Sequence, residues 1–181
     1  MLEVRWHGRG GQGVVTSSQL LALSAIRDGK YAIHIPEFGP ERRGAPVRAY
    51  TRIDESEIDI RSSVLNPDIV VVVDPGLISF KEMITTGLKE DGIIIYNTPN
   101  PEKARKIDNF KTYAVDAYHI AYEVIGRPIY NTAMLGAVVG VTKLVNLESV
   151  FEETKKRFGD KLGEINIKAI KRGFKEVFEV G

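Results

Sequence analysis

Hydrophobic and polar residues follow each other along the chain in patterns that predict strands separated by helices. Residues 2–6 alternate between apolar and polar, as in a strand with one solvated face, and residues 14–26 carry apolar side chains at helical spacing. Unbroken apolar runs at 69–73 and 93–96 predict strands buried on both faces, as in the centre of a parallel sheet. The pattern therefore predicts an α/β fold: a single doubly wound, mostly parallel sheet flanked by helices, Rossmann-like in type.

The rest of the chain continues this alternation, and we expect residues 1–181 to form a single domain. Residues 58–60 are expected to pair back on a strand at 47–53, forming a hairpin after a proline-rich loop. Gly136 and Gly140 lie one turn apart in an apolar helix, which predicts close approach of another backbone. The other predicted elements are strands at 31–35 and 112–115, a short helix ending near 84, and helices at 117–125, 132–145, 147–158 and 164–178.

Composition excludes several classes of function. With 25 basic and 24 acidic residues the net charge is +1, so bulk charge gives no reason to expect nucleic acid as a partner. No apolar run approaches the roughly 20 residues that span a bilayer, and the start of the chain lacks the apolar core of a signal peptide, so we expect a cytoplasmic protein without membrane contact. The absence of cysteine excludes a thiol nucleophile, a disulfide and thiolate ligation of an iron–sulfur cluster or structural zinc.

Histidines and glutamines are few. The three histidines are far apart in sequence, so no metal site is expected. Two glutamines and 27% charged residues are typical of a protein from a thermophile.

The strongest candidate for ligand binding is the glycine-rich loop between the first strand and the first helix. Gly8, Gly10 and Gly13 satisfy the dinucleotide-binding spacing, with a strand before and a helix after. Such a loop lets backbone amides approach a phosphate, and the positive end of the helix dipole points to the same place. The alternative is a tight turn that needs glycine for its own geometry. The candidate ligand-binding residues are Gly8, Arg9, Gly10, Gly11, Gln12 and Gly13.

For two side chains of this loop, the sequence allows either a ligand-binding or a structural role. Arg9 is suited to a phosphate or pyrophosphate through its planar guanidinium, or it forms a salt bridge to a neighbouring acidic residue. Gln12 has an amide that both donates and accepts, so it either binds a ligand or braces the turn.

A nicotinamide dinucleotide requires an acidic residue about 20 positions further on, at the end of the second strand, to hold the ribose. Glu37 is in range, but it opens the proline-rich loop at 36–46, so NAD is disfavoured. The charged group Glu41, Arg42 and Arg43 in that loop is an anion site, a docking surface or a solvated cluster, and Glu37 is a further candidate for such an interface or anion contact. The surrounding prolines limit its conformations, and for this reason we favour an interface.

Three further residues are candidates for a ligand-binding or catalytic role. Asp74 follows the best buried strand, where open α/β sheets bind ligands, although an aspartate there more often caps the next turn. His119 is expected to be packed or hydrogen-bonded within a helix, and His7 adjoins the glycine-rich loop without a catalytic partner. No catalytic set emerges, so we assign no catalytic residue.

Two long segments carry a resemblance to a known family. Residues 5–16 and 36–47 resemble the two signatures of the gamma subunit of 2-oxoacid:ferredoxin oxidoreductases. Asp74-Pro75 after a run of valines and Asn131-Thr132 before an apolar helix also agree, so the similarity covers essentially the whole chain. The second segment is more similar to the pyruvate and 2-oxoisovalerate enzymes than to the 2-oxoglutarate enzymes.

The resemblance implies a heteromeric complex in which other subunits perform the redox chemistry. Alpha and beta subunits hold thiamine diphosphate and magnesium, and beta and a delta subunit carry iron–sulfur clusters. The complex decarboxylates a 2-oxoacid, passes two electrons to ferredoxin and transfers the acyl group to coenzyme A. This chain lacks the family's thiamine-binding Gly-Asp-Gly pattern, so it is not catalytic alone.

In related single-chain enzymes the domain equivalent to gamma helps to bind coenzyme A. Our hypothesis from the sequence is therefore that the loop from Gly8 to Gly13 receives a phosphate of coenzyme A, with Arg9 and either Arg42 or Arg43 adding charge. The alternatives are a stand-alone NAD- or flavin-dependent oxidoreductase and a purely structural subunit whose glycine-rich loops serve docking.

Overall fold

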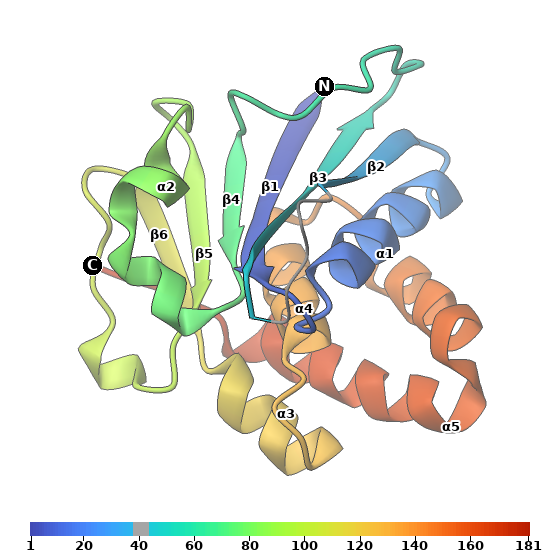
Figure 1. The fold of residues 1–181 in the computed structure, drawn as a ribbon. Coiled ribbons are helices and arrows are strands. Elements are labelled where there is room, and N and C mark those ends of the chain that lie inside the picture. The colour runs from blue at the N-terminus through green and yellow to red at the C-terminus, as the bar shows by residue number, and fades with distance from the viewer. Residues whose placement is uncertain (38–43) are drawn as a thin grey trace.

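The predicted strands and helices form one sheet with helices packed on it (Figure 1), in a computed structural model that describes residues 1–37 and 44–181. The strands are β1 (Leu2–Arg9), β2 (Tyr31–Glu37), β3 (Pro46–Asp54), β4 (Ile69–Val72), β5 (Ile93–Asn97), β6 (Lys111–Val115) and β7 (Phe178–Glu179). The helices are α1 (Val14–Arg27), α2 (Lys81–Thr85), α3 (Ala117–Ile125), α4 (Asn131–Thr142) and α5 (Leu147–Glu176), with short 3-10 turns η1 (Pro75–Ser79) and η2 (Pro101–Lys103).

The sheet is parallel in its centre and antiparallel at its edges, with the strand order β2-β3-β1-β4-β5-β6-β7. Strands β1, β4, β5 and β6 run parallel, and one row across them joins Trp6, Val71, Ile95 and Tyr113. Strand β3 pairs antiparallel with both β1 and β2, and β7 pairs antiparallel with β6. The prediction of a single, mostly parallel α/β sheet is confirmed, and its antiparallel pairs lie at the edges.

The predicted hairpin between 47–53 and 58–60 is wrong. Both edges of β3 are already occupied, by β1 and β2, so no edge remains for residues 58–60. These residues form no strand, and the guanidinium of Arg52 instead binds the carbonyl oxygens of Ile60 and Ser62 at 2.9 and 2.6 Å. The hairpin that does form joins β2 to β3 across the proline-rich loop.

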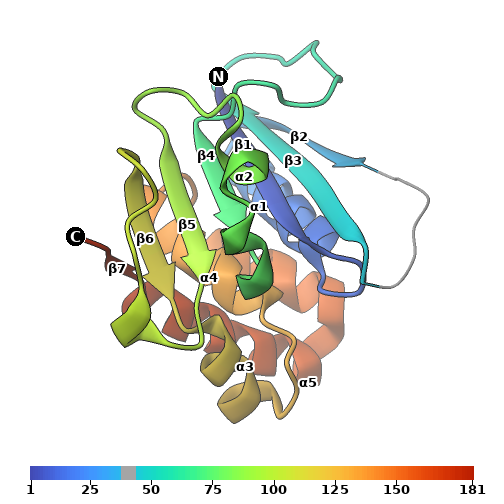
Figure 2. The ribbon, with the colours of Figure 1, turned by 60° about the vertical axis from the view of Figure 1, so that its left-hand side comes forward.

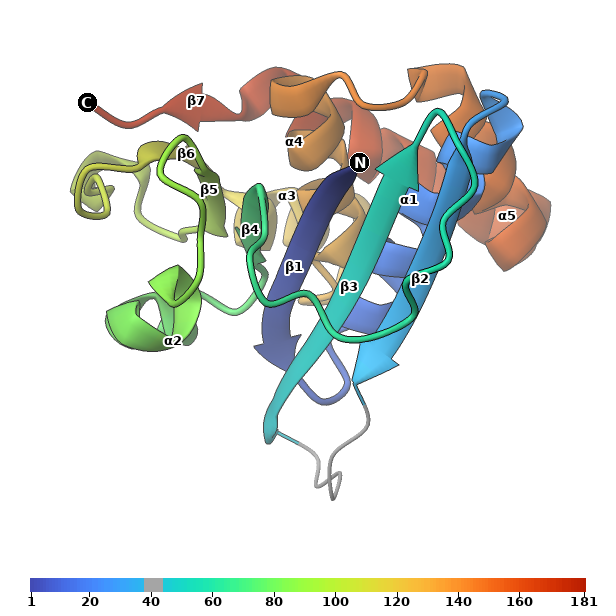
Figure 3. The ribbon, with the colours of Figure 1, turned by 90° about the horizontal axis from the view of Figure 1, so that it is seen from above.

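The helices cover the two faces of the sheet unequally. Helices α1, α3, α4 and α5 pack on one face (Figure 3), where they share the larger hydrophobic core with β1, β3, β4 and β5. The other face carries η1 and α2 beside β4 and β5 (Figure 2), over a smaller core that includes Val70, Val72, Leu77 and Ile84. Because α1 leaves β1 to one face and α2 follows β4 on the other, the carboxyl ends of β1 and β4 form the topological switch point of the sheet.

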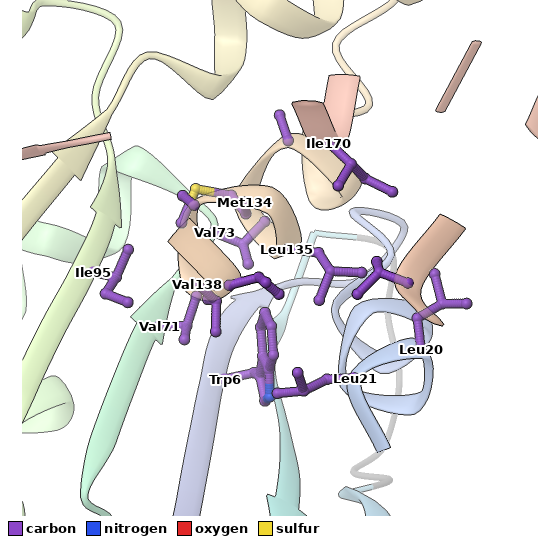
Figure 4. Packing of buried hydrophobic residues seen from close by; sticks show 14 of the residues in the cluster. Trp6, Leu20, Leu21, Val71, Val73, Ile95, Met134, Leu135, Val138 and Ile170 are labelled. Carbon is purple, nitrogen blue, oxygen red and sulfur yellow. The ribbon is translucent and has the colours of Figure 1, made fainter. Parts of the chain in front are cut away.

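The larger core is centred on Trp6, which is fully buried between α1, α4 and the sheet (Figure 4). Its indole Nε1 donates a hydrogen bond to Thr51 Oγ1 at 3.1 Å, so its one polar atom is satisfied. Leu21 of α1 and Val138 of α4 lie close to it in Figure 4, and all three are fully buried or nearly so. This packing fixes where α1 starts relative to the end of β1.

Helix α4 approaches α5 more closely than side chains usually allow. A Cβ atom on Gly136 would lie 2.1 Å from the carbonyl oxygen of Ile170, and one on Gly173 would lie 1.9 Å from that of Ala133. The two backbones therefore touch at glycines from both helices, which confirms the close approach predicted at Gly136 and Gly140.

Helix α5 is broken at Gly159, whose φ and ψ are 75° and 176°. The break separates two helical segments, as the sequence pattern predicts, although the second begins directly after Gly159. In the described residues, no helix combines the length and apolar character needed to cross a bilayer.

Candidate functional site

The glycine-rich loop joins β1 to α1, and two of its glycines are required by packing. A Cβ atom on Gly8 would lie 2.3 Å from Val14 Cγ2, so this glycine lets the start of α1 lie against β1. Gly13 has a φ of +74°, and a Cβ atom there would lie 2.6 Å from Asn131 Nδ2. The glycine spacing therefore serves the geometry of the turn, as the alternative interpretation of the sequence predicts, and phosphate binding stays a prediction.

Some backbone amides of the loop are already used within the chain. Gly10 N donates to Ala45 O at 2.9 Å, and Gln12 N donates to Arg9 O at 3.1 Å. Within residues 1–37 and 44–181, the amides of Gly11, Gly13 and residues 14–16 have no hydrogen-bond acceptor. Gly13 is the N-cap of α1 and offers no side chain to satisfy them. This loop and the first turn of α1 therefore present free donors at the positive end of a 14-residue helix.

Of the residues with free amides, Gly11, Gly13 and Thr16 border a cavity of about 560 Å³. Three segments form its walls: the start of α1, the connection between α3 and α4, and the two sides of the break in α5. The lining residues are Gly11, Gly13, Thr16, Ile125, Arg127, Ile129, Asn131, Phe158, Leu162, Ile165 and Asn166. A second hollow of about 250 Å³ lies on the other side of the loop, lined by Arg9, Gly10, Gly11, Gly13, Val14, Val15 and Val47. The larger cavity has the size and the mostly apolar wall typical of a small-molecule site.

Asn131 connects the wall of the cavity to the loop. Its Nδ2 donates to Gly13 O at 3.4 Å, and its own carbonyl oxygen accepts from Ser17 Oγ at 3.0 Å. Its side-chain Oδ1 is buried and has no partner among the described residues. An orphaned acceptor of this kind is uncommon in a folded protein.

The switch-point crevice between β1 and β4 is filled by the chain's own side chains. Asp74, at the end of β4, accepts hydrogen bonds from Gln12 Nε2 and from Arg9 Nε, the latter at 3.3 Å. Gln12 Oε1 accepts from Arg9 N at 2.7 Å, and Gln12 Nε2 also donates to Tyr130 Oη at 3.1 Å. Of the roles left open by the sequence, Gln12 therefore braces the turn, and Arg9 forms an ion pair.

Asp74 and His119 are also engaged within the chain. Asp74 Oδ1 accepts from Gly76 N at 2.9 Å and caps η1, which confirms the capping interpretation. His119 is exposed and hydrogen-bonded to Asp116, which caps α3. Neither residue faces the cavity.

His7 lies close to the loop in sequence but on the face of the sheet opposite to α1. Its Nε2 accepts a hydrogen bond from Arg5 Nε at 3.0 Å, and its ring is 1% exposed. Arg5 also donates to the carbonyl oxygens of Ile84 and Thr86, so its buried guanidinium is held by the end of α2. Burial, and secondly the charge of Arg5, lower the pKa of His7 to about 3. This histidine is a neutral structural acceptor.

Glu37 does not occupy the position of a ribose-binding acid. It ends β2, so the expectation that it lies in the loop is wrong. However, β2 is separated from β1 by β3, and Glu37 pairs with Arg48 at 2.9 Å and with the hydroxyl of Tyr50. These partners lie on the face opposite to α1, away from the loop amides. The predicted interface group Glu41, Arg42 and Arg43 falls outside the described residues.

The walls contributed by the α3–α4 connection and by α5 were not identified from the sequence. Phe158 and Leu162 flank the break at Gly159, and Arg127 follows the left-handed glycine that ends α3. No motif links these positions to residues 8–13, because the fold alone brings them together. Asn131 carried part of the family resemblance but was not predicted as a site residue.

Comparison with known proteins agrees with the resemblance found in the sequence. Residues 3–176 match the family model described as pyruvate ferredoxin/flavodoxin oxidoreductase. The common gamma subunit of the pyruvate/ketoisovalerate oxidoreductases of Thermococcus kodakarensis is 50% identical over 179 residues, covering 96% of each chain.

Solved structures give the same result. The crystal structure of subunit PORC of the Thermotoga maritima pyruvate oxidoreductase superposes with a TM-score of 0.86 at 44% identity, covering 99% of this chain and 98% of that one. The 2-oxoglutarate:ferredoxin oxidoreductase of Magnetococcus marinus, solved with 2-oxoglutarate, coenzyme A and succinyl-CoA, shares the fold with a TM-score of 0.79 at 19% identity, over 95% of this chain and 30% of that longer one. The chain therefore belongs to the pyruvate ferredoxin/flavodoxin oxidoreductase family, as a gamma subunit of the 2-oxoacid:ferredoxin oxidoreductase type.

Proposed function

We propose that this gamma subunit helps to bind coenzyme A within a complex that oxidises a 2-oxoacid, pyruvate in the first place. The overall reaction is 2-oxoacid, coenzyme A and two oxidised ferredoxins to acyl-coenzyme A, carbon dioxide, two reduced ferredoxins and a proton. Thiamine diphosphate, magnesium and iron–sulfur clusters belong to the alpha, beta and delta subunits and supply the decarboxylation and electron transfer. This chain contributes binding and assembly and carries none of these groups.

The observation that carries the proposal is the meeting of free amides and an apolar cavity at the start of α1. Amides of Gly11, Gly13 and the first helical turn are available to an anion, and Gly11, Gly13 and Thr16 line the 560 Å³ cavity. Coenzyme A combines a diphosphate with an adenine ring system and an uncharged pantetheine arm. Its diphosphate fits the amides, and its uncharged parts fit the apolar walls.

Charge on the cavity wall supports an anionic ligand. Arg127 lines the cavity, and among the described residues its side chain forms no ion pair. The candidate anion contacts of the sequence are thereby revised: Arg127 takes the place given to Arg9, since Arg9 is paired with Asp74. The proposed contacts are Gly11, Gly13, Thr16 and Arg127, while Gly8, Gly10 and Gln12 shape the loop.

The same geometry disfavours the alternative of a stand-alone NAD-dependent oxidoreductase. Such a site places an acidic residue at the end of the strand next to β1, where it holds the ribose hydroxyls. Here β1 lies between β3, which is antiparallel to it, and β4. Glu37 is bonded to Arg48 on the opposite face of the sheet, and Asp74, after β4, is already paired with Arg9. The fold shared with an oxidoreductase solved with coenzyme A supports the coenzyme A assignment.

Replacing Thr16 by glutamate tests this site without weakening the fold. Thr16 lies in the first turn of α1 and lines the cavity, so a carboxylate there favours the helix dipole but repels a diphosphate. We expect the affinity of the assembled complex for coenzyme A, measured by titration calorimetry, to fall by at least about tenfold, or roughly 1.4 kcal/mol.

The matched control is Thr16→Gln, which has the same size without the charge and should stay within about threefold of the unchanged complex. NAD and FAD should give no binding heat that depends on Thr16. Equal affinity for coenzyme A in the Glu and Gln variants would place the coenzyme elsewhere and refute the proposal.

A further inference from the structure

Asp74 lies behind the glycine-rich loop and contacts it through two side chains. Its side chain is 12% exposed, and its carboxylate accepts hydrogen bonds from Gln12 Nε2 and Arg9 Nε, both from the loop, and from Gly76 N of its own turn. Charge-assisted hydrogen bonds of this kind are stronger than those between neutral groups. Asp74 therefore ties the loop to the end of β4.

The amide of Gln12 extends this connection in two directions. Its Oε1 accepts from the Arg9 amide at 2.7 Å, which closes the loop on itself, and its Nε2 also donates to Tyr130 Oη at 3.1 Å. Tyr130 immediately precedes α4 and packs on Tyr118 of α3, with ring centroids 6.3 Å apart. One side-chain amide thus joins the loop, the end of β4 and the α3–α4 connection, two of which line the cavity.

Arg9 is oriented toward Asp74 and away from the cavity of the proposed ligand. Its Nε pairs with the Asp74 carboxylate at 3.3 Å and its Nη1 donates to Gly44 O at 3.1 Å. Arg9 does not line the 560 Å³ cavity, whereas Gly11 and Gly13 do. The guanidinium compensates the charge of a carboxylate that would otherwise face the anion from behind the loop.

We propose, on the basis of the proposed function, that Asp74 is a positioning residue for coenzyme A. It holds the loop through Gln12 and Arg9 in the conformation that directs the amides of Gly11 and Gly13 into the cavity. Arg9 then acts on the ligand through Asp74 and not by contact with a phosphate.

A double-mutant cycle on the assembled complex separates the two roles of Arg9. We expect Arg9→Ala and Asp74→Asn each to raise the KM for coenzyme A about tenfold, the size expected for one charge-assisted hydrogen bond. The KM of the double variant for coenzyme A should be no higher than that of the single variant with the higher KM, because both changes remove the same connection. Turnover at saturating coenzyme A and the KM for the 2-oxoacid should change less than twofold, which a general loss of structure would not produce.

Multiplied effects, about a hundredfold in the double variant, would overturn the proposal, since they would mean that Arg9 contacts the ligand independently. Gln12→Ala combined with Asp74→Asn gives a second cycle with the same expected coupling, which serves if an Arg9 variant does not assemble. The matched control is Asp116→Asn, because Asp116 also follows a parallel strand and caps the next helix but does not touch the loop. If Thr16→Glu is without effect, the proposed function fails; if Thr16→Glu acts but neither cycle shows coupling, only the positioning role fails.

Discussion

Replacing Gly173 by alanine should lower the free energy of unfolding of the chain by roughly 3 kcal/mol, at the upper end of the cost of overpacking. The added Cβ atom would lie 1.9 Å from the carbonyl oxygen of Ala133 and 2.8 Å from its carbonyl carbon, both backbone atoms of α4. Backbone contacts of this kind are relieved only by moving the two helices apart. Helix propensity alone predicts the opposite sign, a gain of about 1 kcal/mol for alanine over glycine.

Urea unfolding gives the free energy, and the melting temperature should fall by roughly 6–12 °C for a chain of this size. Gly136→Ala should behave similarly, because its Cβ atom would meet Ile170 O at 2.1 Å. The control is Lys168→Ala on the exposed side of α5, which should change stability by less than about 0.5 kcal/mol. A stabilised Gly173→Ala variant would show that α4 and α5 are further apart than described.

Removing the imidazole at position 7 should flatten the pH dependence of stability. Burial lowers the pKa of His7 from 6.5 to about 3. Between these two pH values the imidazole is protonated in the unfolded chain and neutral in the folded chain. Stability from this group is therefore present above pH 6.5 and is lost as the pH falls toward 3. Two pH units below 6.5, the loss amounts to about 2.7 kcal/mol.

His7→Gln keeps an acceptor for Arg5 Nε and lacks the titrating group. Between pH 7.5 and 4.5, the unchanged chain should lose about 2.7 kcal/mol more stability than this variant in urea unfolding. Carboxylates titrate in both proteins and cancel in the comparison. Parallel pH profiles for the His7→Gln and unchanged chains would show that His7 is accessible to protons in the fold.

The elements with a strong periodic signal were predictable from the sequence. The valine and isoleucine runs at β4 and β5 are buried in the sheet, and the glycine spacing in α4 marks the contact with α5. The pattern also predicted two helices, at 147–158 and 164–178, where the structure has one helix broken at Gly159. In each case a local property, either burial on both faces or the lack of a Cβ atom, determines the structure.

The misplaced features depend on contacts between segments far apart in sequence. Residues 58–60 have a strand-like pattern, but β1 had already taken the edge of β3. The role of Arg9 depends on the position of Asp74 in the fold. The cavity exists only because Arg127 and the two sides of the break in α5 lie next to the loop. The sequence therefore singled out the glycine-rich loop as a candidate site, while the fold determines which of its groups remain available to a ligand.

A cryo-electron microscopy map of the assembled complex with coenzyme A bound tests the central claim directly. We expect density for the diphosphate within hydrogen-bond distance of the amides of Gly11 and Gly13, with the rest of the nucleotide in the cavity beside Thr16 and Arg127. Coenzyme A resolved against other subunits, with this cavity closed by side chains in the complex, would contradict the account.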